Sequence, residues 1–221
     1  MKNLFYFLIS LVIAKNTFCQ QNYPHIIIET TEGNMELILY DNTPMHSDNF
    51  IELVKQGFYD ELLFHRTIPE FMIQSGDPNS KNALKGKLLG TGGPDYNIPA
   101  EFNPSYYHKR GALAAARQPD RINPNKESSG SQFYIVQGKT FSIQELNAFE
   151  AQGLHIPFTD EQKHYYTSVG GTPHLDYAYT VFGELVEGFD VLYRISQKPT
   201  DRNNRPLEDV KIIKSYIKEK N

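Results

Sequence analysis

Short runs of β-branched and aromatic residues, separated by turn-forming residues, constrain the fold of this chain most strongly. Such runs occur at residues 25–30, 34–40, 63–68, 71–75, 111–116, 131–136, 180–186 and 210–217. Only two framework helices are expected among them, one opening at Thr43-Pro44 and ending near Gly57, the other at 189–196. Many short strands with few helices predict a mainly β protein, either an antiparallel barrel or a sandwich. The length of 221 residues fits a single domain.

The first of these helices carries signals at its start and along one side. Thr43 is expected to cap the N-terminus, and Pro44 suits the first turn. Phe50, Leu53 and Val54 recur at the spacing of a single helical face. This spacing predicts an amphipathic helix.

Residues 139–171 differ in character from the strand-rich sequence on either side. Two capping-box patterns pair a Ser or Thr with a Glu or Gln three residues later: Ser142 with Glu145, and Thr159 with Gln162. They predict two short helices, at about 143–152 and 160–168, which together form a helical insertion. The sequence is equally compatible with a role in binding partner or substrate chains and with a plain solvated extension.

The N-terminal nineteen residues have the pattern of a secretory signal peptide. Lys2 gives a positive start, and an apolar run follows at 4–14. Cleavage is expected after Cys19 or within a few residues of it, so we assign residues 1–19 to a signal peptide and the mature protein to the periplasm or the outside of the cell. A short membrane anchor and a lipoprotein are the alternatives. The run is short for a membrane span, and bulky Phe18 stands where a lipoprotein signal needs a small residue.

One arginine stands within an apolar and aromatic run, FHRTIPEFMIQSGD at residues 64–77. Arg66 cannot lose its charge and offers a rigid fork of donors, so it must pair with a carboxylate or face a binding surface. The nearest acid is Glu70, in the expected turn between two strands. Alternation along the second strand places Met72 and Gln74 on one face. The run therefore predicts a groove with one fixed cation, suited to a neutral and partly apolar ligand.

The run at 131–136 alternates in the same way. Gln132 and Tyr134 point to one side, whereas Phe133 points to the other and is expected in the core. A face that mixes polar and apolar side chains is typical of a ligand groove. An exposed sheet face with scattered polar residues is the alternative.

Several separated motifs match one family in the order in which they occur along the chain. They are FHRxIPxFMxQxGD at residues 64–77, GTGG at 90–93, IPAEF at 98–102, SQFY at 131–134 and VFG at 181–183. The sequence resembles the cyclophilins, the cyclophilin-type peptidyl-prolyl cis-trans isomerases, and GTGGP followed by IPAEF resembles their bacterial branch. The resemblance makes residues 25–218 a single isomerase domain that contains the insertion 139–171.

The resemblance implies a closed eight-stranded antiparallel barrel, capped by two helices, with a groove for Xaa-Pro segments on its outer face. Arg66 would be the catalytic residue. The other groove positions carry over as substrate-binding residues: Phe71, Met72, Tyr134 and Leu175 in the proline pocket, Gln74 and Gln132 as polar groove residues, Ala116 and Arg117 along the backbone-binding edge, and Tyr179 where animal relatives often have His. The resemblance implies neither a metal nor a cofactor.

The chain departs from the family pattern at three positions of the groove. Arg117 replaces an asparagine, and its long side chain would narrow the groove if it folded inward. Tyr134 stands where many relatives carry Phe, so the pocket gains a hydroxyl. His174 stands where cyclosporin-sensitive relatives have Trp, and weak cyclosporin inhibition is expected because the indole donor is missing.

The chemistry of such a groove follows from the nature of the peptide bond. Rotation about an Xaa-Pro bond breaks the C–N resonance and makes the lone pair of the nitrogen available. A donor aimed at that nitrogen binds the twisted state better than either planar state. Arg66 can supply this donor without proton transfer. Lowering the barrier by about 7 kcal/mol would accelerate rotation roughly 10⁵-fold.

We therefore expect a monomeric, exported peptidyl-prolyl cis-trans isomerase that acts on proline-containing segments of unfolded or nascent exported proteins. A non-catalytic proline-binding or chaperone module of the same fold is the alternative. A small hydrolase is disfavoured because no Ser/His/Asp or Cys/His arrangement stands in a recognisable context. The formal net charge of −4 shows no basic excess, so nucleic acid is not expected as a partner.

Overall fold

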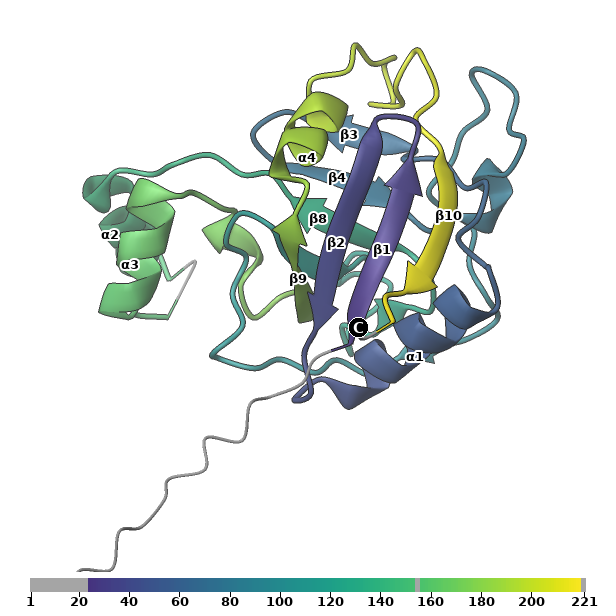
Figure 1. The fold of residues 1–221 in the computed structure, drawn as a ribbon. Coiled ribbons are helices and arrows are strands. Elements are labelled where there is room, and N and C mark those ends of the chain that lie inside the picture. Colours follow the sequence, from purple (N-terminus) through teal and green to yellow (C-terminus); the bar gives the residue numbers. More distant parts are fainter. Residues whose placement is uncertain (1–23, 154–155, 220–221) are drawn as a thin grey trace, which may run out of the picture.

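A computed structural model describes residues 24–153 and 156–219 of the chain. Its largest element is an eight-stranded antiparallel sheet in the order β10-β1-β2-β9-β6-β8-β4-β3 (Figure 1). The strands are β1 (His25–Thr30), β2 (Gly33–Leu39), β3 (Arg66–Ile68), β4 (Met72–Ser75), β6 (Ala112–Ala115), β8 (Phe133–Val136), β9 (Val181–Glu187) and β10 (Ile212–Ile217). Each falls within or next to a run that predicts a strand, so the mainly β fold is confirmed.

The sheet curls so that its two end strands, β10 and β3, come near each other. The backbone N–H of Glu61 donates to the carbonyl of Ile212 at 2.8 Å, and the N–H of Ile212 donates to Leu62 at 2.8 Å. The N–H of Phe64 donates to Val210 at 2.9 Å. These bonds join the segment before β3 to the start of β10. The sheet is a strongly curled half-barrel, and its complete closure stays a prediction.

The inner face of the sheet forms the main core together with two helices. Ile73 and Phe133 point inward from β4 and β8 and are buried. The helices α1 (Pro44–Lys55) and α4 (Phe189–Ser196) pack their apolar faces onto this core. Phe50 of α1 meets the ring of Phe133 edge-on, with 5.3 Å between ring centroids. Both framework helices are therefore where the sequence predicts them.

The outer face of β4, β6 and β8 carries a second, smaller apolar cluster. It includes Met72, Ala114 and Tyr134. Gln74 lies directly opposite Tyr134 in the register of β4 and β8. Met72 and Tyr134 are only 1% and 4% exposed, so the alternative of an exposed sheet face is wrong. Leu175 belongs to this cluster, Phe71 and Tyr179 pack against it, and all three line the site described below.

A carboxylate from a distant loop, and not Thr43, satisfies the N-terminus of α1. The Thr43 side chain makes no capping bond, and its hydroxyl donates instead to the carbonyl of Tyr40 at 3.4 Å. Glu101 accepts hydrogen bonds from the backbone N–H groups of Met45 at 3.1 Å and His46 at 2.9 Å. The capping prediction for Thr43 is wrong because an ionised carboxylate interacts more strongly than a hydroxyl with these N–H groups and with the positive end of the helix.

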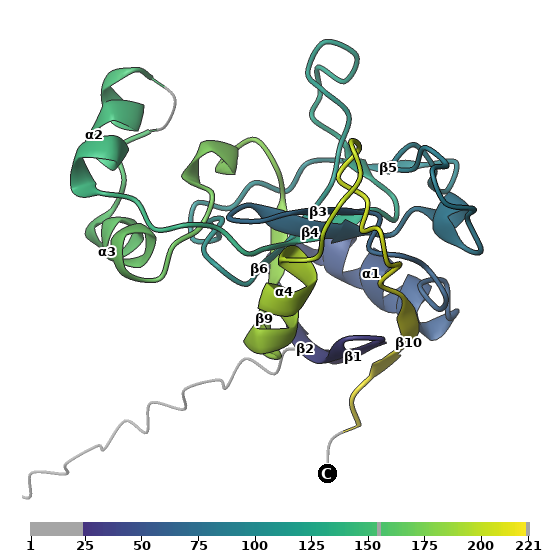
Figure 2. The same cartoon turned by 90° about the horizontal axis from the view of Figure 1, so that it is seen from above.

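Two helices, α2 (Ile143–Ala151) and α3 (Asp160–Ser168), form the predicted insertion. Each begins with the complete capping box that the sequence predicts. The pair projects to one side of the sheet in both views (Figures 1 and 2). It packs around a small apolar cluster that consists of Tyr107, Phe141, Leu146, Phe158 and Tyr166. The insertion is therefore a folded unit with a core of its own.

The predicted signal peptide, residues 1–19, lies outside the described residues. Within residues 24–153 and 156–219, no helix has both the length and the apolar character needed to cross a bilayer.

Candidate active site

A small pocket of about 110 Å³ opens on the outer face of the sheet. Its lining consists of Arg66, Phe71, Met72, Gln74, Ala116, Arg117, Tyr134, Leu175 and Tyr179. Every residue predicted for the site belongs to this set except Gln132, which lies next to it. Residues separated by more than a hundred positions in the sequence are thus brought together at one place.

Part of the pocket lining is apolar and aromatic. Met72 and Tyr134 rise from β4 and β8, and Leu175 belongs to the short turn η2 (Pro173–Leu175). The ring of Phe71 stacks on His174, with 5.7 Å between ring centroids and 27° between the planes. Such a pocket suits a compact apolar ring.

Arg66 lines this pocket and is bound by a neighbouring amide. Its Nη1 donates to Gln74 Oε1 at 3.2 Å, and its guanidinium carbon lies 5.7 Å from the centroid of Phe71. No acid among the described residues lies within ion-pair distance of it. Burial lowers the pKa of Arg66 from its usual value, although an arginine stays protonated throughout the physiological range. Of the two arrangements that the sequence leaves open, the structure shows the arginine lining a pocket instead of pairing with a carboxylate of the described residues.

A chain of amide hydrogen bonds holds Arg66 in this position. Gln74 Nε2 donates to Gln132 Oε1 at 3.0 Å, and Gln132 Nε2 donates to the carbonyl of Gly92 at 2.6 Å. Each amide accepts with its oxygen and donates with its nitrogen, so every bond in the chain has a consistent direction. Gln74 is therefore an orienting partner of Arg66.

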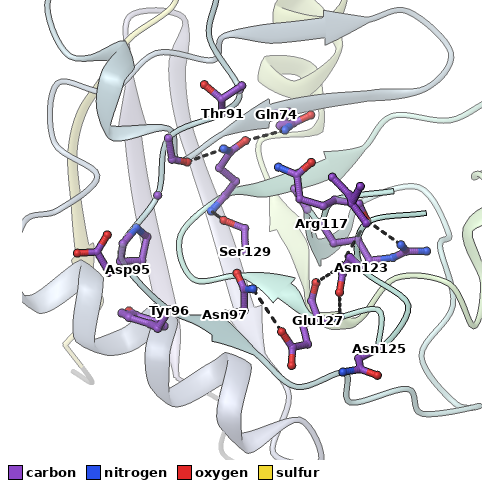
Figure 3. Close-up of a pocket in the computed structure, with 18 of the residues that line it drawn as sticks. Gln74, Thr91, Asp95, Tyr96, Asn97, Arg117, Asn123, Asn125, Glu127 and Ser129 are labelled. Carbon is purple, nitrogen blue, oxygen red and sulfur yellow. Dashed lines mark hydrogen bonds between the residues drawn. The ribbon is translucent and has the colours of Figure 1, made fainter. Parts of the chain in front are cut away.

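A larger hollow of about 540 Å³ adjoins the pocket and shares Gln74, Ala116 and Arg117 with it. Figure 3 shows Asp95 and Tyr96 on one side of this hollow and Arg117 on the other. The loops at 90–97 and 117–129 form most of its lining. The sequence analysis did not predict this hollow, because the glycines at 90–93 indicated only a loop.

The first of these loops is built around a buried carboxylate. Asp77 Oδ2 accepts from the N–H of Gly90 at 2.5 Å, and its Oδ1 accepts from the N–H of Asn79 at 2.8 Å. A Cβ at Gly92 would lie 2.2 Å from Asp77 Oδ1, so only glycine fits there. This close approach places the Gly92 carbonyl where Gln132 binds it.

Arg117 folds against the wall of the pocket instead of extending into solvent. Its Nε donates to the carbonyl of Ala178 at 2.6 Å, and its Nη1 donates to that of Gln118 at 2.9 Å. Its guanidinium lies 4.5 Å from the ring centroid of Tyr179 and forms an ion pair with Asp120 at 2.6 Å. The side chain thus lines both the pocket and the larger hollow, and a narrowing of the groove by Arg117 stays a prediction.

The hydroxyl that Tyr134 adds to the pocket is already engaged. It lies 2.9 Å from His108 Nε2, and His108 Nδ1 lies 2.8 Å from Asp176 Oδ1. Burial raises the pKa of Tyr134 well above its usual value, so the hydroxyl keeps its proton. Sequence reasoning missed His108 and Asp176, since neither stands in a pattern that marks a pocket.

The part of the chain that the structure describes contains no group of three or more His, Cys, Asp or Glu side chains placed to hold a metal ion. The site offers hydrogen-bond donors, a partly apolar pocket and two arginines, Arg66 and Arg117.

Together, the curled antiparallel sheet and an outer-face pocket lined by Arg66, Phe71 and Met72 define a cyclophilin-like peptide isomerase. A sequence model of the family described as cyclophilin type peptidyl-prolyl cis-trans isomerase/CLD matches residues 25–217. This chain belongs to that family. The resemblance inferred from the motifs is confirmed, and with it the assignment of the chain as a peptidyl-prolyl cis-trans isomerase.

Individual relatives agree with this assignment. A protein of Staphylococcus aureus named as a peptidyl-prolyl cis-trans isomerase is 33% identical over 205 residues, 92% of this chain and 96% of that protein. A Streptococcus pyogenes protein named as a bifunctional phosphatase/peptidyl-prolyl cis-trans isomerase is 39% identical over 192 residues, 85% of this chain but only 37% of that protein. The crystal structure of a cyclophilin type peptidyl-prolyl cis-trans isomerase from Cryptosporidium parvum superposes with a TM-score of 0.64 and 25% identity, covering 90% of this chain and 100% of that one.

Proposed function

We propose that this isomerase rotates Xaa-Pro bonds in the pocket beside Arg66, with Arg66 as its catalytic residue. One observation carries the proposal. Arg66 is half-buried, has no carboxylate partner among the described residues, and donates from Nη1 to Gln74 Oε1 at 3.2 Å. As the C–N bond twists, the proline nitrogen becomes an acceptor, and the guanidinium can donate to it. The planar states offer no such acceptor, so the interaction favours the transition state selectively.

The pocket supports proline as the residue that is bound. Met72, Tyr134 and Leu175 form the apolar part of a pocket of about 110 Å³, which is about the size of a pyrrolidine ring. Proline-containing polypeptides are thus the proposed substrates. The pocket holds the proline ring in place while the preceding residue stays free to rotate about the Xaa-Pro bond.

The setting in which the enzyme works is also a proposal. The signal-peptide pattern at 1–19 supports export, with unfolded or nascent exported proteins as clients and a chaperone-like role in the periplasm or outside the cell. We further propose a monomer, and a sheet that closes into a complete barrel through the backbone bonds between Glu61–Phe64 and Val210–Ile212.

A proline-limited peptide isomerisation assay tests the activity and the role of Arg66 together. The wild-type chain without residues 1–19 is expected to accelerate isomerisation strongly, and Arg66→Ala to lower kcat/KM about 100-fold or more, since a single electrostatic donor is worth about 3 kcal/mol in comparable sites. Arg194→Ala is the matched control, because Arg194 is an exposed arginine of α4 paired with Asp190 and lies outside the pocket. Uncatalysed rates for both the wild type and Arg66→Ala would favour the non-catalytic binding module.

Export is tested by producing the full chain in a Gram-negative host and measuring the molecular mass of the periplasmic protein by mass spectrometry. A mature chain that begins within a few residues of Cys19 supports the proposal. Full-length protein confined to the cytoplasm contradicts it. Light scattering of the mature protein gives its oligomeric state.

A further inference from the structure

A side chain of the inserted helix α3 reaches into the main body of the protein. Tyr166 is fully buried, and its hydroxyl donates to Asp176 Oδ2 at 2.6 Å. Asp176 directly follows η2, the turn that supplies Leu175 to the pocket wall. This hydrogen bond therefore links the insertion to the segment that supplies Leu175 to the pocket.

The second oxygen of Asp176 binds His108 twice. Oδ1 accepts from the backbone N–H of His108 and from its ring Nδ1, both at 2.8 Å. The Asp176 side chain is only 2% exposed and that of His108 only 1%. A buried carboxylate is tolerated only when donors surround it, and here the donors come from two separate segments of the chain.

The bond at Nδ1 fixes the tautomer of His108 and therefore what its other nitrogen can do. In the neutral tautomer whose Nδ1–H donates to the carboxylate, Nε2 accepts a hydrogen bond from the Tyr134 hydroxyl, 2.9 Å away. The rings of His108 and Tyr134 are nearly parallel, at 14° and 6.0 Å between centroids. The chain of bonds thus runs from α3 to the floor of the pocket with every donor and acceptor satisfied.

We propose that α3 sets the geometry of the proline pocket, and that Tyr166, Asp176 and His108 are positioning residues that fix the ring of Tyr134. In a cavity of about 110 Å³, a small tilt of the floor changes how well a five-membered ring fits. The insertion is then part of the binding apparatus and not a solvated extension. This proposal rests on the assignment of the pocket to proline.

Steady-state kinetics on four variants tests it. Tyr166→Phe removes the first bond of the chain and Tyr134→Phe the last, and both keep the aromatic packing. Each is expected to raise KM for a proline peptide about five-fold, the equivalent of one hydrogen bond, with kcat changed less than about two-fold. The double variant is expected to show no larger KM than either single variant, because both changes break the same chain.

Tyr107→Phe is the matched control for loss of packing at the insertion. The Tyr107 hydroxyl also contacts α3, through Glu161 at 3.3 Å, but it has no bond to the chain that leads to Tyr134. This variant is expected to leave KM unchanged, whatever it does to the melting temperature.

Several results would overturn the positioning role. An unchanged KM in Tyr134→Phe removes the basis of the proposal, and this variant leaves the insertion intact, so it is decisive even if Tyr166→Phe folds poorly. Multiplying effects in the double variant, or an equal KM rise in Tyr107→Phe, would assign Tyr166 to packing alone. If the wild type proves inactive, the proposed function fails separately, and the same comparison is made on the Kd of a proline peptide.

Discussion

Replacing Arg117 with alanine tests how far one side chain supports the wall of the pocket. The guanidinium binds the carbonyls of Ala178 and Gln118 and covers the ring of Tyr179. The Arg117 side chain is only 4% exposed. Its ion-pair partner Asp120 is 64% exposed, so that pair lies at the solvent-facing end of the side chain.

The expected loss follows from these contacts. Hydrogen bonds from a charged donor contribute about 1.5 kcal/mol each, and a partly buried cation–π contact contributes about 1 kcal/mol. With some relaxation of the two loops, we expect Arg117→Ala to lower the free energy of unfolding by about 3 kcal/mol, which is roughly 10 °C in Tm for a domain of this size. The exposed pair adds little, so Asp120→Ala should leave Tm nearly unchanged.

Thermal unfolding and peptide kinetics on the two variants check this reasoning. Tyr179 loses the cation above its ring in Arg117→Ala, so KM for a proline peptide should rise while Asp120→Ala stays close to the wild type. A Tm within about 2 °C of the wild type in Arg117→Ala, a change typical of a surface substitution, would show that the contacts are not structural. An equal loss in both variants would place the energy in the ion pair, against the argument from exposure.

Three further predictions concern other parts of the molecule. Glu101→Ala should lower the free energy of unfolding in urea by about 3 kcal/mol, because it frees two N–H groups at the start of α1, and a change below about 0.5 kcal/mol would refute the capping role. Burial lowers the pKa of His65 to about 4, so the unfolded chain takes up its proton first, and stability should fall as the pH drops from about 6.5 to about 4, by about 3 kcal/mol in all. His65→Gln should flatten this part of the pH profile, and an unchanged slope would exclude His65 as its source. Cyclosporin should inhibit weakly, with His174→Trp strengthening inhibition, and nanomolar inhibition of the wild type would contradict this.

Local patterns in the sequence predict most of the elements but not their ends. The strand expected at 131–136 begins only at Phe133, because Ser131 and Gln132 are used in a turn. Ser131 Oγ donates to the carbonyl of Gly76 at 2.7 Å, and the N–H of Gln132 donates to Ser129 Oγ at 3.1 Å. Strand propensity cannot reveal such competition, since the partners come from other segments.

The strand expected at 63–68 is shortened for a similar reason. Its first residues bond to the segment before β10, and only Arg66–Ile68 pair with β4. The apolar pattern shows that a residue is in an extended segment, but not which neighbour takes its hydrogen bonds. The small ladder of β5 (Asn97–Ile98) and β7 (Ser128–Ser129) escaped prediction because two-residue strands carry no periodicity.

Whether a hydrogen bond could be predicted from the sequence depends on how far apart its two residues lie along the chain. Ser142 and Glu145 are three residues apart, and their capping box could be predicted from that spacing alone. Glu101 and His46 are 55 residues apart, and nothing in the sequence near Thr43 indicates that a carboxylate will arrive there. The groove residues were predicted through alternation and through resemblance to a family, which carries long-range information that a single pattern lacks.

The tyrosine at the pocket floor shows how such distant partners depend on one another. A buried hydroxyl in place of the Phe of many relatives would be costly unless an acceptor were present, and His108 supplies it. His108 can accept at Nε2 because Asp176 holds the proton on Nδ1. The buried Asp176 in turn gains a donor in Tyr166, which only the insertion provides. Tyr134 and the inserted helix are therefore linked through His108 and Asp176, and replacing both tyrosines should disturb the pocket no more than replacing either one alone.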